Sequence, residues 1–154
     1  MDTQATIKQE AEALLTKMIG KFEVEVTDEG DNVYHVVVKT EEEAPTVIGR
    51  HGETIRALQK ILEVVLYKQL GQSISVLLNV NDYRERQRVR LEGIAAQLAE
   101  KVIETQRPAP FRGLSSYERK MIHEYVTHQY PDLTTYSVGE GRDRQLMIDV
   151  KREE

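Results

Sequence analysis

The chain has 154 residues, of which 40% are hydrophobic and 31% charged, a composition that excludes a disordered tail and fits one ordinary domain or two small ones. It contains no cysteine, which excludes a disulfide framework, a thiolate metal site and a cysteine nucleophile. No apolar run approaches the roughly 18 residues of a membrane-spanning helix and no signal peptide is visible, so we expect no membrane insertion and a cytoplasmic location.

The net charge of −5 is unevenly distributed. Residues 1–40 carry 4 basic and 8 acidic side chains, whereas residues 82–154 carry 13 of each. The acidic excess therefore lies near the N-terminus. Since a local basic surface matters more for nucleic-acid binding than the total charge, the net charge alone does not exclude such a partner.

The first half of the chain alternates between helical and strand periodicity. Apolar residues at helical spacing predict a helix over residues 4–19 that stops at Gly20. Alternating residues predict strands around 22–26, over 33–39 and over 74–80, the first two joined by turn residues 28–32. Between the second and third strands lie a short apolar element, Thr46–Ile48, a glycine-containing turn, and a long helix that ends at Gly71.

The second half begins with a long helix over about residues 82–106, which Pro108 and Pro110 end. Ser115 and Glu118 have the spacing of a capping box and predict the start of another helix. Two strands, 134–138 and 144–151, follow and are joined by a glycine-containing turn. The boundary between two domains, 1–81 and 82–154, is therefore expected near residue 81.

The turn Gly49-Arg50-His51-Gly52 is the first candidate site. Two glycines three apart let the backbone approach a ligand closely, and the helix that follows offers unpaired N–H groups that suit a phosphate. Arg50 adds a permanent positive charge and His51 a polar side chain. An ordinary structural helix start is the alternative for this turn.

Arg119 and His123 form the second candidate site, because residues four apart on a helix project from the same face. Arg offers a rigid fork of donors to phosphate, and His adds a hydrogen bond or a titratable charge. The alternative is structural, with His123 packed against the sheet and Arg119 paired with an acid. Four arginines near the start of the predicted long helix form a third basic group: Arg84, Arg86, Arg88 and Arg90. They either contact successive phosphates of a bound strand or form a solvated helix face.

The order helix, strand, strand, short helix, Gly-x-x-Gly, helix, strand resembles the type II KH fold, a three-stranded sheet with helices on one face. Followed by an Arg-x-x-x-His (R-three-H) domain of small α/β type, it resembles the bacterial Jag family, also called KhpB, over roughly residues 4–152. The segments that carry this resemblance are Ile48–Thr54 with Ala57-Leu58-Gln59, Asn81–Arg84 with Arg86 and Arg88, Glu118-Arg119 with His123, Thr135-Tyr136-Ser137, and Gly139-Glu140-Gly141 with Arg144.

The resemblance implies an α+β chain that binds RNA in bacterial gene regulation linked to cell division or envelope growth. It implies a clamp formed by Gly49, Arg50, His51 and Gly52, with Ile48, Ile55 and Arg56 in the groove and on its flank, and a second nucleic-acid site at Arg119 and His123. Many members carry an additional N-terminal Jag domain and a charged linker, which this sequence lacks. A second basic residue is also commoner at the position of His51.

The leading hypothesis is therefore a non-catalytic binder of single-stranded RNA, with single-stranded DNA as an open alternative. The second hypothesis is an adaptor that dimerises through its KH domain, either with itself or with a small single-KH protein. A nuclease is the third and weakest, since no nucleophile–base pair is evident. No His/Asp/Glu cluster has metal-ligand spacing, so we expect no metal and no cofactor.

Overall fold

The computed structural model describes residues 2–153. These residues form two units, one ending at Arg84 and the other beginning at Glu85. The division lies just inside a helix, a little beyond the predicted boundary at residue 81. No helix in the described part of the chain combines the length and apolarity needed to cross a bilayer.

The first unit has the predicted element order. Its helices and strands are α1 (Thr3–Thr16), β1 (Glu23–Gly30), β2 (Val33–Lys39), α2 (Ala44–Ile48), α3 (Glu53–Leu70) and β3 (Ser75–Val80). The sheet order is β1-β2-β3, in which β1 and β2 are antiparallel and β2 and β3 parallel. This αββααβ order with a mixed three-stranded sheet confirms the fold class predicted for the first half of the chain.

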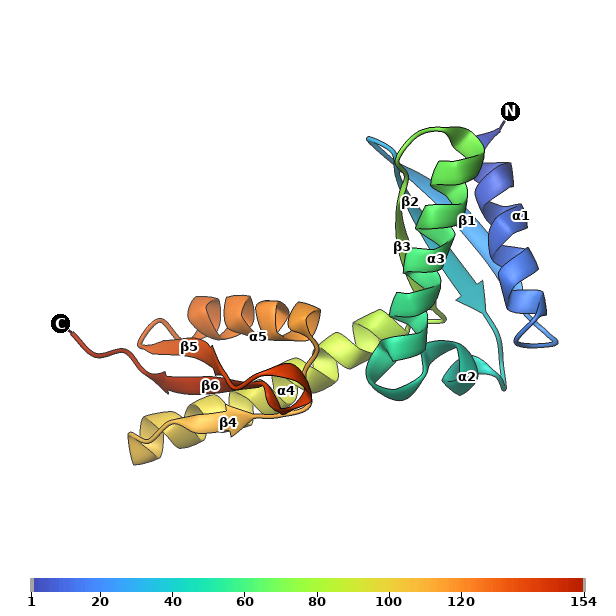
Figure 1. Ribbon diagram of the computed structural model, residues 1–154. Helices are drawn as coiled ribbons and strands as arrows, with labels where there is room; N and C mark the ends of the chain where they lie inside the picture. The colour runs from blue at the N-terminus through green and yellow to red at the C-terminus, as the bar shows by residue number, and fades with distance from the viewer. Residues whose placement is uncertain (1, 154) are drawn as a thin grey trace. The chain divides into compact units, whose positions relative to one another are not determined.

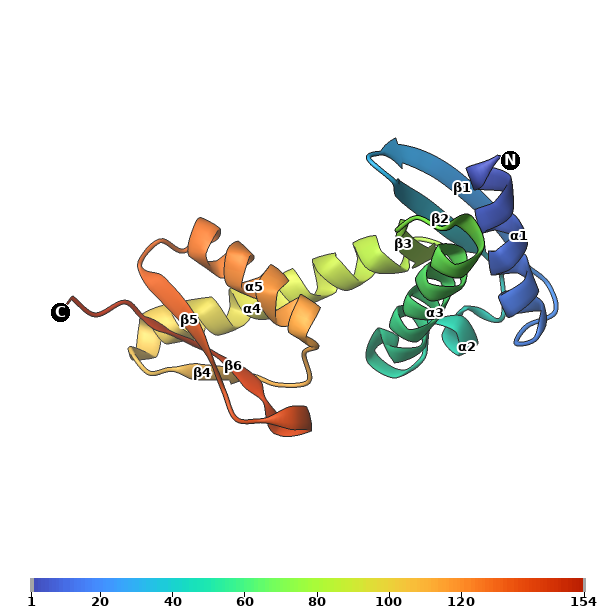
Figure 2. The ribbon, with the colours of Figure 1, turned by 45° about the horizontal axis from the view of Figure 1, so that its top comes forward.

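The core of the first unit lies between one face of the sheet and the helices. On β2 the side chains of Tyr34, Val36 and Val38 are buried, while the alternate residues face the other side, as the two-residue strand period requires. Both α1 and α3 lie along this buried face (Figures 1 and 2). From α3 the buried contribution comes from residues at helical spacing: Ile55, Leu58, Leu62 and Leu66.

Two elements of the first unit differ from the prediction. Helix α1 ends at Thr16 rather than near residue 19, because a tighter turn follows in which the N–H groups of Met18 and Ile19 both donate to the Leu15 carbonyl. The short apolar element is a helix that begins at Ala44, with Pro45 in its first turn. Proline is compatible with that position because its missing N–H has no partner there in any helix.

The second unit places two helices against another three-stranded sheet. Its elements are α4 (Tyr83–Thr105, which begins in the first unit), β4 (Ala109–Phe111), α5 (Ser116–Gln129), β5 (Leu133–Val138) and β6 (Gln145–Val150). The order β4-β6-β5 is antiparallel throughout. Apolar side chains of α4 and α5 meet those of the strands in one core: Leu91, Ala95, Ala99, Val102, Ile122, Val126, Leu133, Leu146 and Ile148.

The predicted start of α5 is confirmed. The Ser115 hydroxyl accepts from the Glu118 N–H at 3.2 Å, and the Glu118 carboxylate accepts from the Ser115 N–H at 3.1 Å, which completes the capping box. Strand β4 was not predicted, because Pro110 in its centre reads as a strand breaker. Proline is tolerated here because β4 is an edge strand, so one side of its backbone needs no strand partner.

Candidate nucleic-acid interface

The Gly-x-x-Gly turn connects α2 to α3 in a backbone conformation that only glycine tolerates at its first position. Gly49 has φ 72° and ψ 178°, and a Cβ built there would lie 2.1 Å from the Thr54 hydroxyl oxygen and 2.9 Å from the Thr54 backbone nitrogen. His51 (φ 56°) and Gly52 (φ 73°) are both left-handed. Histidine adopts this conformation more readily than most residues. Glycine is thus required at Gly49 by geometry and favoured at Gly52.

The side chains of the turn divide into an outward and an inward set. Arg50 and His51 are exposed, whereas Gly52 is buried. Helix α3 begins directly after Gly52, and no side chain caps its N-terminus. Arg56, in the first part of α3, folds back so that its Nη1 donates to the His51 carbonyl oxygen at 2.9 Å. The turn therefore presents a cation, an imidazole and the positive end of a helix dipole together.

The apolar residues beside the turn contribute mainly to the core. Ile55 is only 2% exposed and packs in the core of the first unit, so the expectation that it lines an RNA groove needs correction. Helical spacing shows that Ile55 faces inward but does not distinguish a groove from a core. Ile48 is half-buried and packs against the same core, which leaves part of its side chain accessible.

Arg119 and His123 lie beside a hollow of about 520 Å³ between α5 and the sheet. His123 shares a short hydrogen bond through Nδ1 with the hydroxyl of buried Thr135 on β5. Arg119 donates to the Leu114 carbonyl at 2.8 Å and to the Ser116 hydroxyl at 3.0 Å. The structure therefore brings these two predicted residues together, and the acid expected beside Arg119 under the structural alternative is replaced by these neutral acceptors.

The lining of this hollow is rich in donors. Besides His123 it includes three cationic side chains and no carboxylate: Ser116, Arg119, Lys120, His123, Thr135, Tyr136, Ser137, Arg144 and Leu146. Cations and hydroxyls without a nearby carboxylate suit an anion such as a phosphate. Across residues 2–153, no group of three His, Asp or Glu side chains lies close enough to hold a metal ion.

The arginines at the start of α4 are engaged in interactions with the protein. Arg84 donates from Nε to the Leu78 carbonyl at 2.6 Å, and Arg88 pairs with Glu92 at 3.0 Å. Arg90 donates to Gln87 at 3.2 Å. Arg88 and Arg90 are exposed, as in the solvated-face reading of this group, whereas Arg84 is partly buried and turned toward β3.

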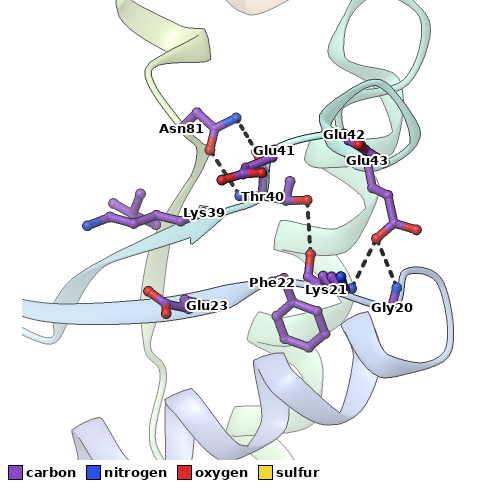
Figure 3. Close-up of a pocket in the computed structure, with 11 residues that line it drawn as sticks. Gly20, Lys21, Phe22, Glu23, Lys39, Thr40, Glu41, Glu42, Glu43 and Asn81 are labelled. Carbon is purple, nitrogen blue, oxygen red and sulfur yellow. Dashed lines mark hydrogen bonds between the residues drawn. The ribbon is translucent and has the colours of Figure 1, made fainter.

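A larger hollow, of about 1070 Å³, lies elsewhere in the first unit and includes no residue of the turn. Figure 3 shows it where the loops before β1 and after β2 meet, with Glu43 accepting from the N–H groups of Gly20 (2.9 Å) and Lys21 (3.1 Å). Lys39 at its edge donates to Glu25 at 2.7 Å, which raises the pKa of Lys39. Its glutamates make it unsuited to a phosphate backbone, whatever its size: Glu23, Glu41, Glu42 and Glu43.

The sequence predicted no role in the two sites for the residues that support them. Lys120 follows Arg119 on α5, whereas the tertiary fold brings Thr135 on β5 and Arg144 before β6 into the hollow with them. The signal available for them was the strand–turn–strand pattern after α5, which places a second strand within reach of the helix. Tyr83 belongs to the segment Asn81–Arg84 that carries the family resemblance, but nothing in the sequence places it beside the glycine turn.

Two family models match the chain. The KH domain of the KhpA/KhpB type matches residues 6–78, and the R-three-H domain matches residues 89–149. The first contains the glycine turn, and the second contains Arg119, His123 and the whole of the hollow. Each of the two sites thus lies in a domain of its own.

Several curated proteins called RNA-binding protein KhpB are similar to the chain. The protein from Bacillus subtilis is 35% identical over 138 residues, which cover 86% of this chain and 64% of that protein. The protein from Streptococcus pneumoniae is 30% identical over 98% of this chain and 47% of its own length. The chain thus spans about half to two thirds of these relatives. It consists of a KhpA/KhpB-type KH domain followed by an R-three-H domain, and it belongs to the family of proteins that combine the two.

Proposed function

We propose that the protein binds single-stranded RNA without catalysing a reaction, through the Gly49–Gly52 turn and the hollow beside Arg119 and His123. The observation that carries this proposal is the glycine-only turn at the uncapped N-terminus of α3, with Arg50 exposed on it. Such a turn grips the nucleic-acid backbone in KH domains. The relatives' name, RNA-binding protein, supports RNA over DNA.

Two weak sites on one chain raise the apparent affinity when both reach the same strand. Arg50 at the turn and three cations at the hollow, Arg119, Lys120 and Arg144, offer about four phosphate contacts. For single strands the slope of log affinity against log salt is about −0.7 per contact, so the affinity should fall about 50-fold between 50 and 200 mM salt. The cellular role that we propose, post-transcriptional regulation linked to cell division, rests on the family resemblance.

The test is a fluorescence-anisotropy titration of a single-stranded RNA pool with Gly52→Asp and a matched control, Gly71→Asp. Both glycines are left-handed, at φ 73° and 70°, and they lie at opposite ends of α3. Gly52→Asp should lose most of the affinity, whereas Gly71→Asp should retain it. Equal losses would show that strain or added charge, rather than the turn, is responsible.

The second site is tested in the same way with Arg119→Gln and, as its control, Arg142→Gln. Arg142 is exposed and does not line the hollow. Arg119→Gln should weaken binding and make the salt dependence shallower by about one contact. An unchanged salt slope would remove the hollow from the RNA site. A parallel titration with DNA of the same sequence separates RNA from single-stranded DNA as the ligand.

A second candidate function, dimerisation through the KH domain, is favoured by an exposed apolar stripe on α3. Ile61, Val64 and Tyr67 are 47%, 57% and 61% exposed, and all face away from the core of the first unit. Large apolar side chains grouped on one helix face often mark a contact with another protein. The partner is a second copy of the chain or a small single-KH protein.

Light scattering after size-exclusion chromatography tests this candidate. Val64→Glu should convert a dimer into a monomer, while Val89→Glu, which changes another exposed valine on α4, should not. A wild type that is monomeric at every concentration excludes the homodimer. Pull-down with a purified single-KH protein then tests whether the heterodimer forms.

A further inference from the structure

The first turn of α4 lies against the glycine turn. A Cβ built on Gly52 would lie 3.1 Å from the Tyr83 hydroxyl oxygen and 3.3 Å from Nη1 of Arg56. Since Gly52 is buried, these two side chains cover the inner side of the turn. Tyr83 is the first residue of α4 and lies beyond residues 6–78, the segment that matches the KH domain.

Contacts that do not involve the glycine turn hold Tyr83 in place. Its ring packs against the core of the first unit. The next residue, Arg84, donates from Nε to the Leu78 carbonyl at 2.6 Å and from Nη2 to the Gln59 side-chain oxygen at 3.0 Å. The same oxygen accepts from the Leu78 N–H at 3.1 Å. The first turn of α4 is thus bonded to both β3 and α3, which anchors the backbone that carries Tyr83.

The conformation of the turn needs such support. His51 and Gly52 are consecutive left-handed residues, and a non-glycine residue in that conformation costs about 1 kcal/mol or more. Arg56 donates to the His51 carbonyl at 2.9 Å, and the Tyr83 hydroxyl occupies the space that a side chain at Gly52 would need. A turn held in its binding conformation beforehand loses less entropy when it meets a ligand.

We propose that Tyr83 is a positioning residue of the RNA clamp, with Arg84 as the anchor that holds it there. This inference rests on the proposed RNA-binding function. It extends the clamp beyond the glycine motif, so that the working KH unit includes the start of α4. A tyrosine that only filled the core would affect stability and leave the RNA affinity of the folded protein unchanged.

The test uses the full chain and two variants, Tyr83→Phe and Tyr83→Leu. Tyr83→Phe keeps the ring and removes the hydroxyl that faces Gly52. Tyr34→Phe is the matched control. Tyr34 is a buried tyrosine, but it lies near the start of β2, whereas the segment that leads to α2 and the glycine turn follows the end of β2. Anisotropy titration with the single-stranded RNA pool, at a temperature where thermal melting shows every variant folded, gives the affinity.

Both Tyr83 variants should bind RNA about three- to tenfold more weakly, the range for one lost supporting contact, while Tyr34→Phe binds as the wild type does. A second readout needs no RNA. Hydrogen exchange at the Gly52 amide should be faster in Tyr83→Phe than in Tyr34→Phe, even where the melting temperatures are equal.

The outcomes separate the two proposals. If the wild type binds RNA, Gly52→Asp does not, and the Tyr83 variants bind as the wild type does, the positioning role is overturned and the RNA function stands. If the wild type binds no RNA, the proposed function is overturned. Unchanged exchange at Gly52 in Tyr83→Phe would contradict the positioning role in either case.

Discussion

Replacing Gly49 with alanine should be the most damaging of the glycine substitutions in the first unit. At φ 72° and ψ 178° the residue lies in a region that is essentially restricted to glycine. The added Cβ would also meet Thr54 at 2.1 Å from its hydroxyl oxygen and 2.9 Å from its backbone nitrogen. Rotation of the Thr54 side chain relieves the first contact but not the second, because the nitrogen belongs to the first turn of α3.

Two other glycines separate the cost of the backbone conformation from the cost of the steric contacts. Gly71→Ala carries only the cost of the left-handed conformation, about 1 kcal/mol, because nothing lies within 4 Å of the added Cβ. Gly52→Ala adds contacts at 3.1 and 3.3 Å with the ends of two side chains, for about 1–2 kcal/mol in total. Gly49→Ala combines a more restricted conformation with a backbone clash and should cost about 3 kcal/mol.

Native-state hydrogen exchange measures these costs in the first unit alone, without assuming that both units unfold together. The amides of Val36 and Val38 lie in the central strand β2 and report its opening. A cost of about 3 kcal/mol corresponds to exchange roughly 100-fold faster. If Gly49→Ala exchanges within about twofold of Gly71→Ala, the backbone clash at Thr54 does not exist as described and the account of the turn is refuted.

Three further predictions concern the supports of the two units. Glu43→Ala removes the acceptor of the Gly20 N–H, so it should cost about 1 kcal/mol and speed exchange at that amide; unaltered exchange would count against the bond. Ser115→Ala breaks the capping box and should lower the stability of the second unit by about 1 kcal/mol in urea unfolding, whereas Ser115→Asp should retain most of it. Burial raises the pKa of the Tyr130 hydroxyl above its usual value near 10, so Tyr130 stabilises the fold fully below pH 10, and this contribution is lost as the pH rises through the folded-state pKa. Tyr130→Phe should therefore lose less stability than the wild type between about pH 10 and 12, and identical alkaline profiles would contradict this.

The order of elements could be predicted because each is encoded by local periodicity. Strand β2 alternates buried and partly exposed residues, and α3 repeats its buried residues at helical spacing. The glycine turn could be located for the same reason, since two glycines with apolar flanks form a local pattern. The two proline-containing elements were harder. Whether Pro45 begins a helix or Pro110 sits in an edge strand depends on neighbours far along the chain.

The supports of the candidate sites could not be predicted, because they are tertiary contacts. The spacing of Arg119 and His123 showed that they share a helix face, but it did not show that Thr135 on β5 would hold the imidazole. Nor could it show that Tyr83 lies beneath Gly52. The count of arginines at the start of α4 suggested a basic surface, whereas the structure engages several of them with protein groups.

The most direct test of RNA binding at both sites is an NMR titration of the isotope-labelled chain with single-stranded RNA. If one RNA strand binds at both sites, the amide signals of Gly49, Gly52 and His123 should move together and saturate at the same RNA concentration. Signals of Gly20 and Lys21, beside the acidic hollow, should stay in place. Shifts confined to Gly20 and Lys21, or no shifts at all with a folded protein, would contradict the account.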